Sequence, residues 1–268
     1  MHLSELLGEL ETYWPAAHSD DWDRVGLTVG ARTDQVHRVL VSVDLTDAVI
    51  DEAIETDCQL IVTHHPALLR GVSSLAEDEL KGALISKLIR AGIATYSAHT
   101  NADVQADGAT SILADLLKLS NREPIVQTTG GFGHGVIGSL PNEIVLADFV
   151  KTLSELLPRV ARGISFAGPK SKLLKRVALC SGAGDSFIPA VIESDADVYI
   201  TSDLRHHPTL DAIETPRENG TLALIDVSHW ASESLWVAGA VERISSNPDL
   251  VAIASKVITD PWTDEVFD

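Results

Sequence analysis

Short apolar runs alternate with longer amphipathic segments along most of the chain. Runs rich in β-branched residues are typical of buried strands, and apolar residues spaced three or four apart are typical of helices. The pattern predicts strands at Val39–Val43, Leu60–Val62, Ile93–Tyr96, Val177–Leu179, Val198–Ile200 and Leu222–Val227. It predicts helices at Thr46–Glu55, Leu80–Arg90, Ala109–Leu117, Ala147–Leu157 and Glu233–Ile244. Because strands and helices alternate, we expect an α/β fold with mostly parallel sheets and flanking helices.

The middle of the chain has a different pattern. Gln127–Pro141 is rich in glycine, and Gly163–Lys172 is also typical of a loop. We therefore expect a second, smaller α/β lobe at residues 126–217. It would be inserted into a first lobe formed by residues 1–125 and 218–268.

The composition is that of a globular protein, with 45% hydrophobic and 22% charged residues among 268. No apolar run approaches the roughly 20 residues of a membrane helix, so we expect no membrane association. The chain has 20 Lys+Arg against 39 Asp+Glu, and the formal charge of −19 argues against general nucleic-acid binding. The N-terminus does not resemble a signal peptide, and only two cysteines occur, Cys58 and Cys180. These features predict a cytoplasmic protein with free thiols.

Two adjacent histidines, His64 and His65, follow the strand predicted at Leu60–Val62. Ligands bind at the carboxyl ends of strands in open α/β sheets, which places this pair where a metal site would form. Side chains alternate along extended backbone, so we expect the two rings to point to opposite sides and to bind one metal each. A plain pair of loop histidines is the alternative.

Metal-binding residue types follow two further predicted strands. His99 and Asp103 come just after Ile93–Tyr96, although a simple turn and helix start would use similar residues. His229 and Glu233 follow Leu222–Val227, and their spacing of four places them on one face of a helix. A solvated pair on that helix is the alternative.

Together, His64, His65, Asp103, His229 and Glu233 supply three imidazoles and two carboxylates. This set exceeds the needs of one zinc ion and suits two divalent ions bridged by a carboxylate. The mixed nitrogen and oxygen ligands are compatible with zinc, iron or manganese. We expect two such ions per chain, with Glu233 as the bridge.

Seven motifs resemble, in their order along the chain, those of the Nif-three-like dinuclear-metal-centre family. They are WDRVGLTVG (Trp22–Gly30), VSVDLT (Val41–Thr46), THHP (Thr63–Pro66), YSAHTNAD (Tyr96–Asp103), SGAGDS (Ser181–Ser186), ADVYITSD (Ala196–Asp203) and SHWASE (Ser228–Glu233). The resemblance implies a two-lobed α/β fold, a toroidal homohexamer and two divalent ions. The family's metal ligands correspond to His64, His65, Asp103, His229 and Glu233. One departure is Ser202, where relatives usually have glycine.

Other polar residues near predicted strand ends have open roles. His99 is a candidate catalytic residue, as a proton shuttle or an orienting group, and a structural histidine is the alternative. Asp23 is interpreted as a turn-forming aspartate. Asp203, His206 and His207 would either line the site or begin a helix.

A dinuclear site predicts a metal-dependent hydrolase, since Lewis-acidic ions activate water for attack on carbon or phosphorus. Members of the resembling family are also described as homologues of GTP cyclohydrolase 1 type 2, which implies a small-molecule substrate such as a nucleotide. The sequence contains no Walker A loop and no motif that selects GTP. The alternative is a non-catalytic hexameric ring that binds metal and recruits a partner.

Overall fold

The computed structural model describes residues 1–128, 133–218 and 220–264. The chain divides into two compact units, of which unit 1 comprises Met1–Gln105 and Trp236–Thr259, and unit 2 comprises Ala106–Leu235 and Asp260–Asp268. Residues 106–235 thus lie in one compact unit, between two segments of the other unit. The smaller lobe expected at residues 126–217 stays a prediction. No helix in the described part of the chain is long and apolar enough to cross a membrane.

Unit 1 contains a five-stranded sheet in the order β1-β4-β3-β2-β13. The strands are β1 (Gly26–Val29), β2 (Arg38–Ser42), β3 (Leu60–Thr63), β4 (Ala94–Ser97) and β13 (Val251–Ala254). Only β1 pairs antiparallel. Ser42, Thr63 and Ser97 lie opposite one another in the register, so β2, β3 and β4 end at the same edge of the sheet.

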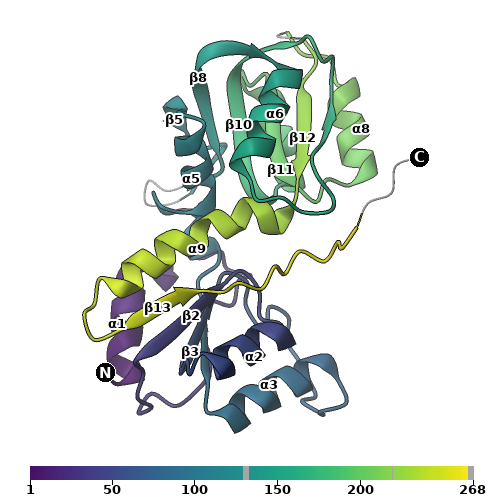
Figure 1. Cartoon of the computed structure of the whole chain (residues 1–268). Coiled ribbons are helices and arrows are strands. Elements are labelled where there is room, and N and C mark those ends of the chain that lie inside the picture. Colours follow the sequence, from purple (N-terminus) through teal and green to yellow (C-terminus); the bar gives the residue numbers. More distant parts are fainter. Residues whose placement is uncertain (129–132, 219, 265–268) are drawn as a thin grey trace. The chain divides into compact units, whose positions relative to one another are not determined.

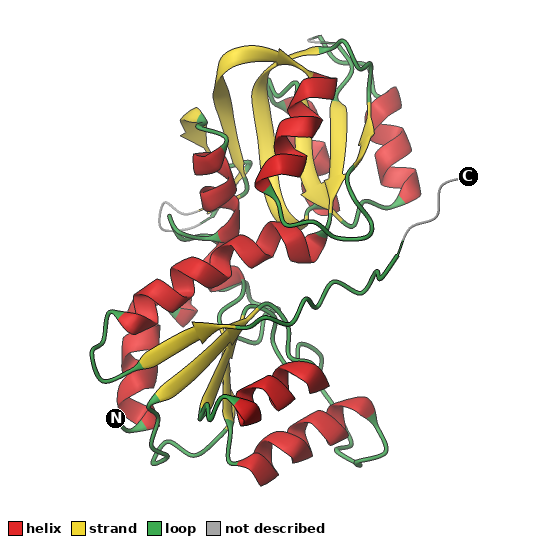
Figure 2. Cartoon of the chain, in the orientation of Figure 1, coloured by secondary structure: helices red, strands yellow, loops and turns green. Residues whose placement is uncertain are grey.

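Helices cover both faces of the unit 1 sheet (Figures 1 and 2). The helical elements of this unit are α1 (Leu3–Tyr13), η1 (Ala16–His18), α2 (Asp47–Glu55), α3 (Leu80–Ala91), α4 (Thr100–Asp103) and the part of α9 (His229–Ser245) from Trp236 onward. One core cluster joins Leu40 and Ile61 of the sheet to apolar residues of α2 and α3. On α1, Leu6 and Leu10 are fully buried. The indole of Trp14 lies 5.3 Å from that of Trp236, measured between ring centroids.

Unit 2 contains a six-stranded sheet in the order β5-β8-β10-β11-β12-β9 and a small two-stranded sheet. The strands are β5 (Ser120–Glu123), β6 (Val126–Gln127), β7 (Gly133–His134), β8 (Val136–Val145), β9 (Ser165–Ala167), β10 (Leu173–Ala183), β11 (Val198–Ser202) and β12 (Ala223–Val227). Among the described residues of this unit, only the β10–β11 and β11–β12 pairings are parallel. The expectation of mostly parallel sheets therefore holds for unit 1, whereas unit 2 is mixed. The antiparallel strands β8 and β9 lie in or beside the segments interpreted as loops.

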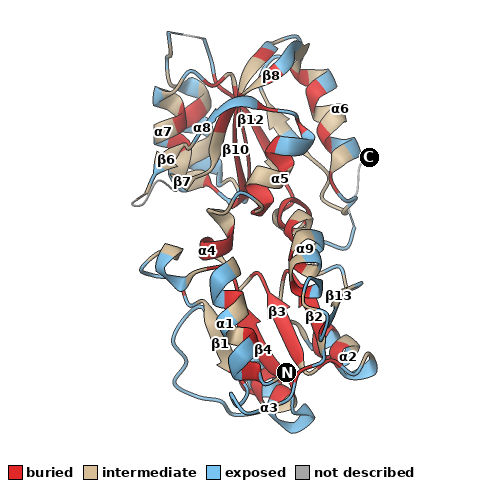
Figure 3. Cartoon of the chain, turned by 90° about the vertical axis from the view of Figure 1, so that its left-hand side faces the viewer, coloured by how far each residue is buried: buried red, intermediate tan, exposed pale blue. Residues whose placement is uncertain are grey.

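The central strands of unit 2 are buried on both faces (Figure 3). Val177 and Val198 pack into one core cluster with α5 (Ala109–Leu116) and α6 (Leu146–Leu156). Their neighbours Ala178 and Tyr199 point the other way, since side chains alternate along a strand, and pack with α7 (Ile188–Glu193) and α8 (His206–Glu214). Residues of α5 and β12 also belong to these clusters, so both elements are part of the core of unit 2.

Candidate metal centre

His64 directly follows β3 and its side chain is fully buried. Its Nδ1–H donates to the carbonyl oxygen of Ala98 at 2.9 Å. A carbonyl oxygen can only accept, so Nδ1 carries the proton and Nε2 presents the lone pair that a metal requires. The Nε2 atom lies 3.6 Å from Oδ1 of Asp103.

The ring of His65 is oriented by a carboxylate from the neighbouring strand end. Its Nδ1 lies 2.7 Å from Oδ1 of Asp44, two residues beyond β2. The other oxygen of Asp44 accepts a hydrogen bond from the hydroxyl of Thr259. A carboxylate behind an imidazole is a common arrangement at metal sites, because it fixes the ring and raises its basicity.

His99 lies after β4 and is oriented in the same way by Asp23, with 2.9 Å between Nδ1 and Oδ1. The buried Asp23 carboxylate also accepts hydrogen bonds from the backbone and hydroxyl of Thr100. Burial alone would raise the pKa of Asp23, but the bonds from His99 and Thr100 outweigh it and hold the pKa well below its usual range. Asp23 therefore does more than form a turn, since as a stable anion it positions His99.

His64, His65 and His99 of unit 1 lie together. The ring centroids of His64 and His65 are 5.2 Å apart, and His99 lies 5.2 Å from His64 and 5.4 Å from His65. One ring nitrogen from each falls within 4.8 Å of the other two. The expectation that His64 and His65 point to opposite sides is therefore wrong. Both residues lie in a bend after β3, where the alternation of a strand no longer applies.

In unit 2, His229 begins α9 and Glu233 follows one turn later. Their spacing places Nε2 of His229 at 3.0 Å from Oε1 of Glu233. Nδ1 of His229 lies 2.6 Å from Oδ2 of Asp203, just beyond β11. The hydrogen bond from His229 lowers the pKa of Asp203. Asp203 therefore orients His229, as Asp44 and Asp23 orient His65 and His99.

A glycine from the SGAGDS motif packs against this pair. Gly182 has a φ of +72°, and a Cβ placed on it would lie 2.2 Å from Oε1 of Glu233. Its backbone N–H donates to the hydroxyl of Ser232 at 3.2 Å. The motif therefore makes room for the Glu233 carboxylate, which is 3% exposed.

The donor chemistry fits divalent ions. Two ligand atoms that each lie about 2.1 Å from one ion are about 3.0 Å apart in octahedral geometry. In tetrahedral geometry they are about 3.4 Å apart. The Nε2–carboxylate separations of 3.6 Å at His64 and 3.0 Å at His229 are close to this spacing. In addition, four imidazoles have Nδ1 bonded to an oxygen acceptor, so that Nε2 is the atom that would bind a metal ion. The acceptors belong to Ala98, Asp44, Asp23 and Asp203.

Comparison with known proteins identifies the family. The model of the DUF34/NIF3 (NGG1p interacting factor 3) family matches residues 1–261. The chain belongs to the DUF34/NIF3 family. It is 37% identical to the protein named GTP cyclohydrolase 1 type 2 homolog of Streptomyces coelicolor, over 98% of this chain and 94% of that one.

Solved members of the family share the fold. The Staphylococcus aureus protein SA1388 matches with a TM-score of 0.87 and 27% identity, over 98% of this chain and 99% of that chain. The Bacillus cereus protein related to NIF3 matches with a TM-score of 0.88 and 22% identity, over 100% of this chain and 99% of that chain. The resemblance inferred from the seven sequence motifs is thereby confirmed.

One residue of this region, Asp44, was not among the predicted site residues, and the roles of several others were undecided. Asp44 lies in the family motif VSVDLT at the end of β2, and its place after a strand was the available signal. His206 and His207 begin α8, one of the two readings left open for them. Ser202 continues β11 and pairs with Val227, while the following Asp203 takes the positive φ of 56°. The strand therefore accepts serine at this position.

Proposed function

We propose that the chain binds two divalent metal ions and uses them to hydrolyse a small-molecule substrate. The ligands would be His64, His65 and Asp103 of unit 1 with His229 and Glu233 of unit 2. The observation that carries the proposal is the shared orientation of the imidazoles, each with Nδ1 bonded to an acceptor oxygen. Metal-binding histidines almost always donate their other ring N–H to a carboxylate, a backbone carbonyl or water, so the arrangement supports metal binding.

The ligand count supports two ions. The proposed residues supply three imidazoles and two carboxylates, which is more than one four-coordinate ion takes. Zinc, iron and manganese all accept this mixture of nitrogen and oxygen.

When bound, two divalent ions supply Lewis acidity, which lowers the pKa of a water molecule and polarises a substrate oxygen. In the hydrolysis, the water oxygen bonds to carbon or phosphorus, the bond to the leaving group breaks, and the leaving group takes up a proton. His99 is our candidate for moving that proton, because Asp23 fixes its ring beside His64 and His65. The name shared by the relatives supports a nucleotide as the substrate class.

Turnover of GTP and of p-nitrophenyl phosphate by metal-loaded protein tests the proposal. We expect hydrolysis of at least one probe, and its loss to the background rate in Glu233→Gln. His37→Asn is the matched control, since His37 is exposed and distant in sequence from every ligand. Two bound ions without turnover of either probe would instead favour the non-catalytic ring that recruits a partner.

A further inference from the structure

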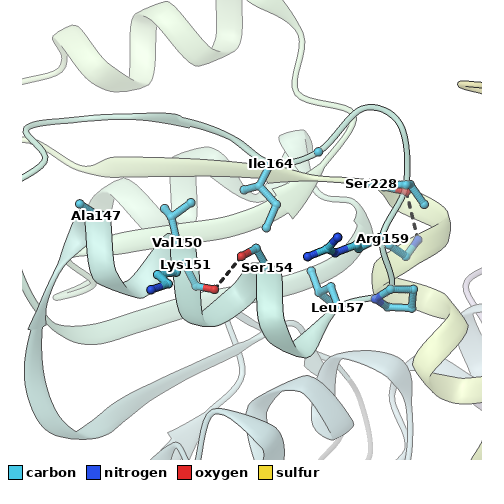
Figure 4. Close-up of a pocket in the computed structure, with 12 residues that line it drawn as sticks. Ala147, Val150, Lys151, Ser154, Leu157, Arg159, Ile164 and Ser228 are labelled. Carbon is cyan, nitrogen blue, oxygen red and sulfur yellow. Dashed lines mark hydrogen bonds between the residues drawn. The ribbon is translucent and has the colours of Figure 1, made fainter. Parts of the chain in front are cut away.

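Unit 2 contains a cavity of about 450 Å³, which we call the α6 pocket. It is lined by one face of α6, by the loop that follows this helix, and by the start of α9 (Figure 4). Ala147, Val150, Ser154 and Leu157 recur every three or four residues, so they share that face. A volume of this size is within the range of small-molecule sites.

One wall of the α6 pocket is apolar. Val150 and Leu157 contribute from α6, and Ile164 contributes from the loop. Leu157 is largely buried and belongs to the core cluster of the unit, while Val150 and Ile164 pack against that cluster. The wall therefore rests on the rigid part of the fold and can hold the apolar part of a ligand in a constant place.

Two cations, Lys151 and Arg159, line the α6 pocket, and no Asp or Glu does. Across residues 1–128, 133–218 and 220–264, no ion pair joins either cation to a carboxylate. Other arginines of this unit, such as Arg162, Arg176 and Arg205, are paired with acids. Both side chains are exposed, and in a chain with a formal charge of −19 two cations that line one pocket favour an anionic ligand.

The start of α9 lies at the edge of the α6 pocket. Ser228 caps this helix: its hydroxyl accepts a hydrogen bond from the backbone N–H of Ala231 at 3.1 Å and donates one to the carboxylate of Asp260. That carboxylate offsets the partial positive charge of the helix N-terminus, so the positive charge of the pocket comes from Lys151 and Arg159. At about 100° per residue, Ala231 lies about 200° around the axis from His229. The pocket is therefore on the face of α9 opposite the proposed metal ligands.

We propose that the α6 pocket binds a small organic anion, separately from the metal centre. Its phosphate or carboxylate group would be bound by Arg159 and Lys151. Its apolar body would pack on Val150, Leu157 and Ile164. Figure 4 shows Arg159 extending from the loop toward Ser154 on α6. A ligand here would contact the first turn of the helix that carries His229 and Glu233, which makes the pocket suited to an effector.

Calorimetric titration of the full chain tests this proposal with four probes. Phenyl phosphate and benzoate have both an anionic group and an apolar body, whereas inorganic phosphate and benzyl alcohol each lack one of these. We expect saturable binding of phenyl phosphate or benzoate, and at least about tenfold weaker binding of the other two. Whichever of phenyl phosphate and benzoate binds more tightly identifies the preferred anionic group, phosphate or carboxylate.

Variants locate the binding. Arg159→Ala should lower the affinity for the probe that binds at least about tenfold, as expected for loss of a charged hydrogen bond. Arg205→Ala, which removes an exposed arginine of the same unit outside the pocket, should leave binding unchanged. Circular dichroism of both variants checks that the fold is retained.

Several results would overturn the proposal. They are the absence of saturable binding, equal weakening by Arg205→Ala, and binding of inorganic phosphate as tight as that of phenyl phosphate. Loss of binding in Glu233→Gln would also overturn it, because the probe would then occupy the metal centre. Conversely, binding that survives Glu233→Gln would support the α6 pocket even if that variant and the wild type both lacked metal.

Discussion

Gly182→Ala should displace Glu233 without changing any proposed ligand. The φ of +72° at Gly182 costs an alanine about 1–2 kcal/mol. The new Cβ would also lie 2.2 Å from Oε1 of Glu233, whereas an ordinary contact is about 3.5 Å. The carboxylate must therefore move by about 1 Å or more, which is more than a metal site tolerates without loss of affinity.

Gly92→Ala is the matched control, because Gly92 has a φ of +67° and open space around its Cβ position. Gly92→Ala should lose about 1–2 kcal/mol of unfolding free energy, measured by urea denaturation of metal-free protein. Gly182→Ala should lose more, because the clash with buried Glu233 adds to the backbone cost. Only Gly182→Ala should also bind metal at least about tenfold more weakly, measured by competition with a chromogenic chelator. If Gly182→Ala binds metal as tightly as Gly92→Ala does, Glu233 is not a ligand in the position that this structure gives it.

Three further predictions concern the orienting carboxylates, the assembly and the surface charge. Asp44→Asn and Asp203→Asn should each lower metal affinity about 10- to 100-fold while the ligands stay in place, and unchanged affinity in a chelator competition would refute their orienting role. Light scattering should give a mass six times that of the 28.7 kDa chain, and a monomer mass across a range of concentrations would refute the hexamer that family resemblance implies. Because the formal charge is −19, a random DNA duplex should bind more weakly than about 1 µM at physiological salt, and tighter binding in a fluorescence-anisotropy titration would contradict this.

Elements with a strong local pattern could be predicted from the sequence. The helix expected at Thr46–Glu55 is α2 (Asp47–Glu55), and the hydroxyl of Thr46 caps it by accepting a hydrogen bond from Val49. The strands expected at Leu60–Val62 and Val198–Ile200 are β3 and β11, in which every residue is buried. Burial on both faces produces continuous apolar runs, which are visible without knowledge of the partner strands.

Elements that depend on distant partners could not be predicted in this way. Strand β8 contains Gly138, Pro141 and Asn142, residues that locally favour turns, and antiparallel pairing with β10 holds it in place. Strand β13 is exposed or half-buried throughout and is held at the edge of its sheet by pairing with β2. Both depend on tertiary hydrogen bonding that no local pattern records.

The same distinction applies to the candidate site. The contact between His229 and Glu233 follows from their spacing on one helix, so the sequence predicts it directly. The carboxylate that orients His65 comes from the end of the adjacent strand, and its place depends on the register of β2 against β3. The proximity of His64 and His65 depends on the bend after β3, which the strand pattern does not reveal.

The metal content per chain tests the central claim most directly. Protein purified without chelator and reconstituted with zinc, iron and manganese in turn should hold about two ions per chain by elemental analysis. Glu233→Gln should lower occupancy at both positions, since it removes a charge that offsets two ions, whereas His65→Asn should empty chiefly one. Less than about half an equivalent of every metal in the wild-type protein would contradict the dinuclear centre.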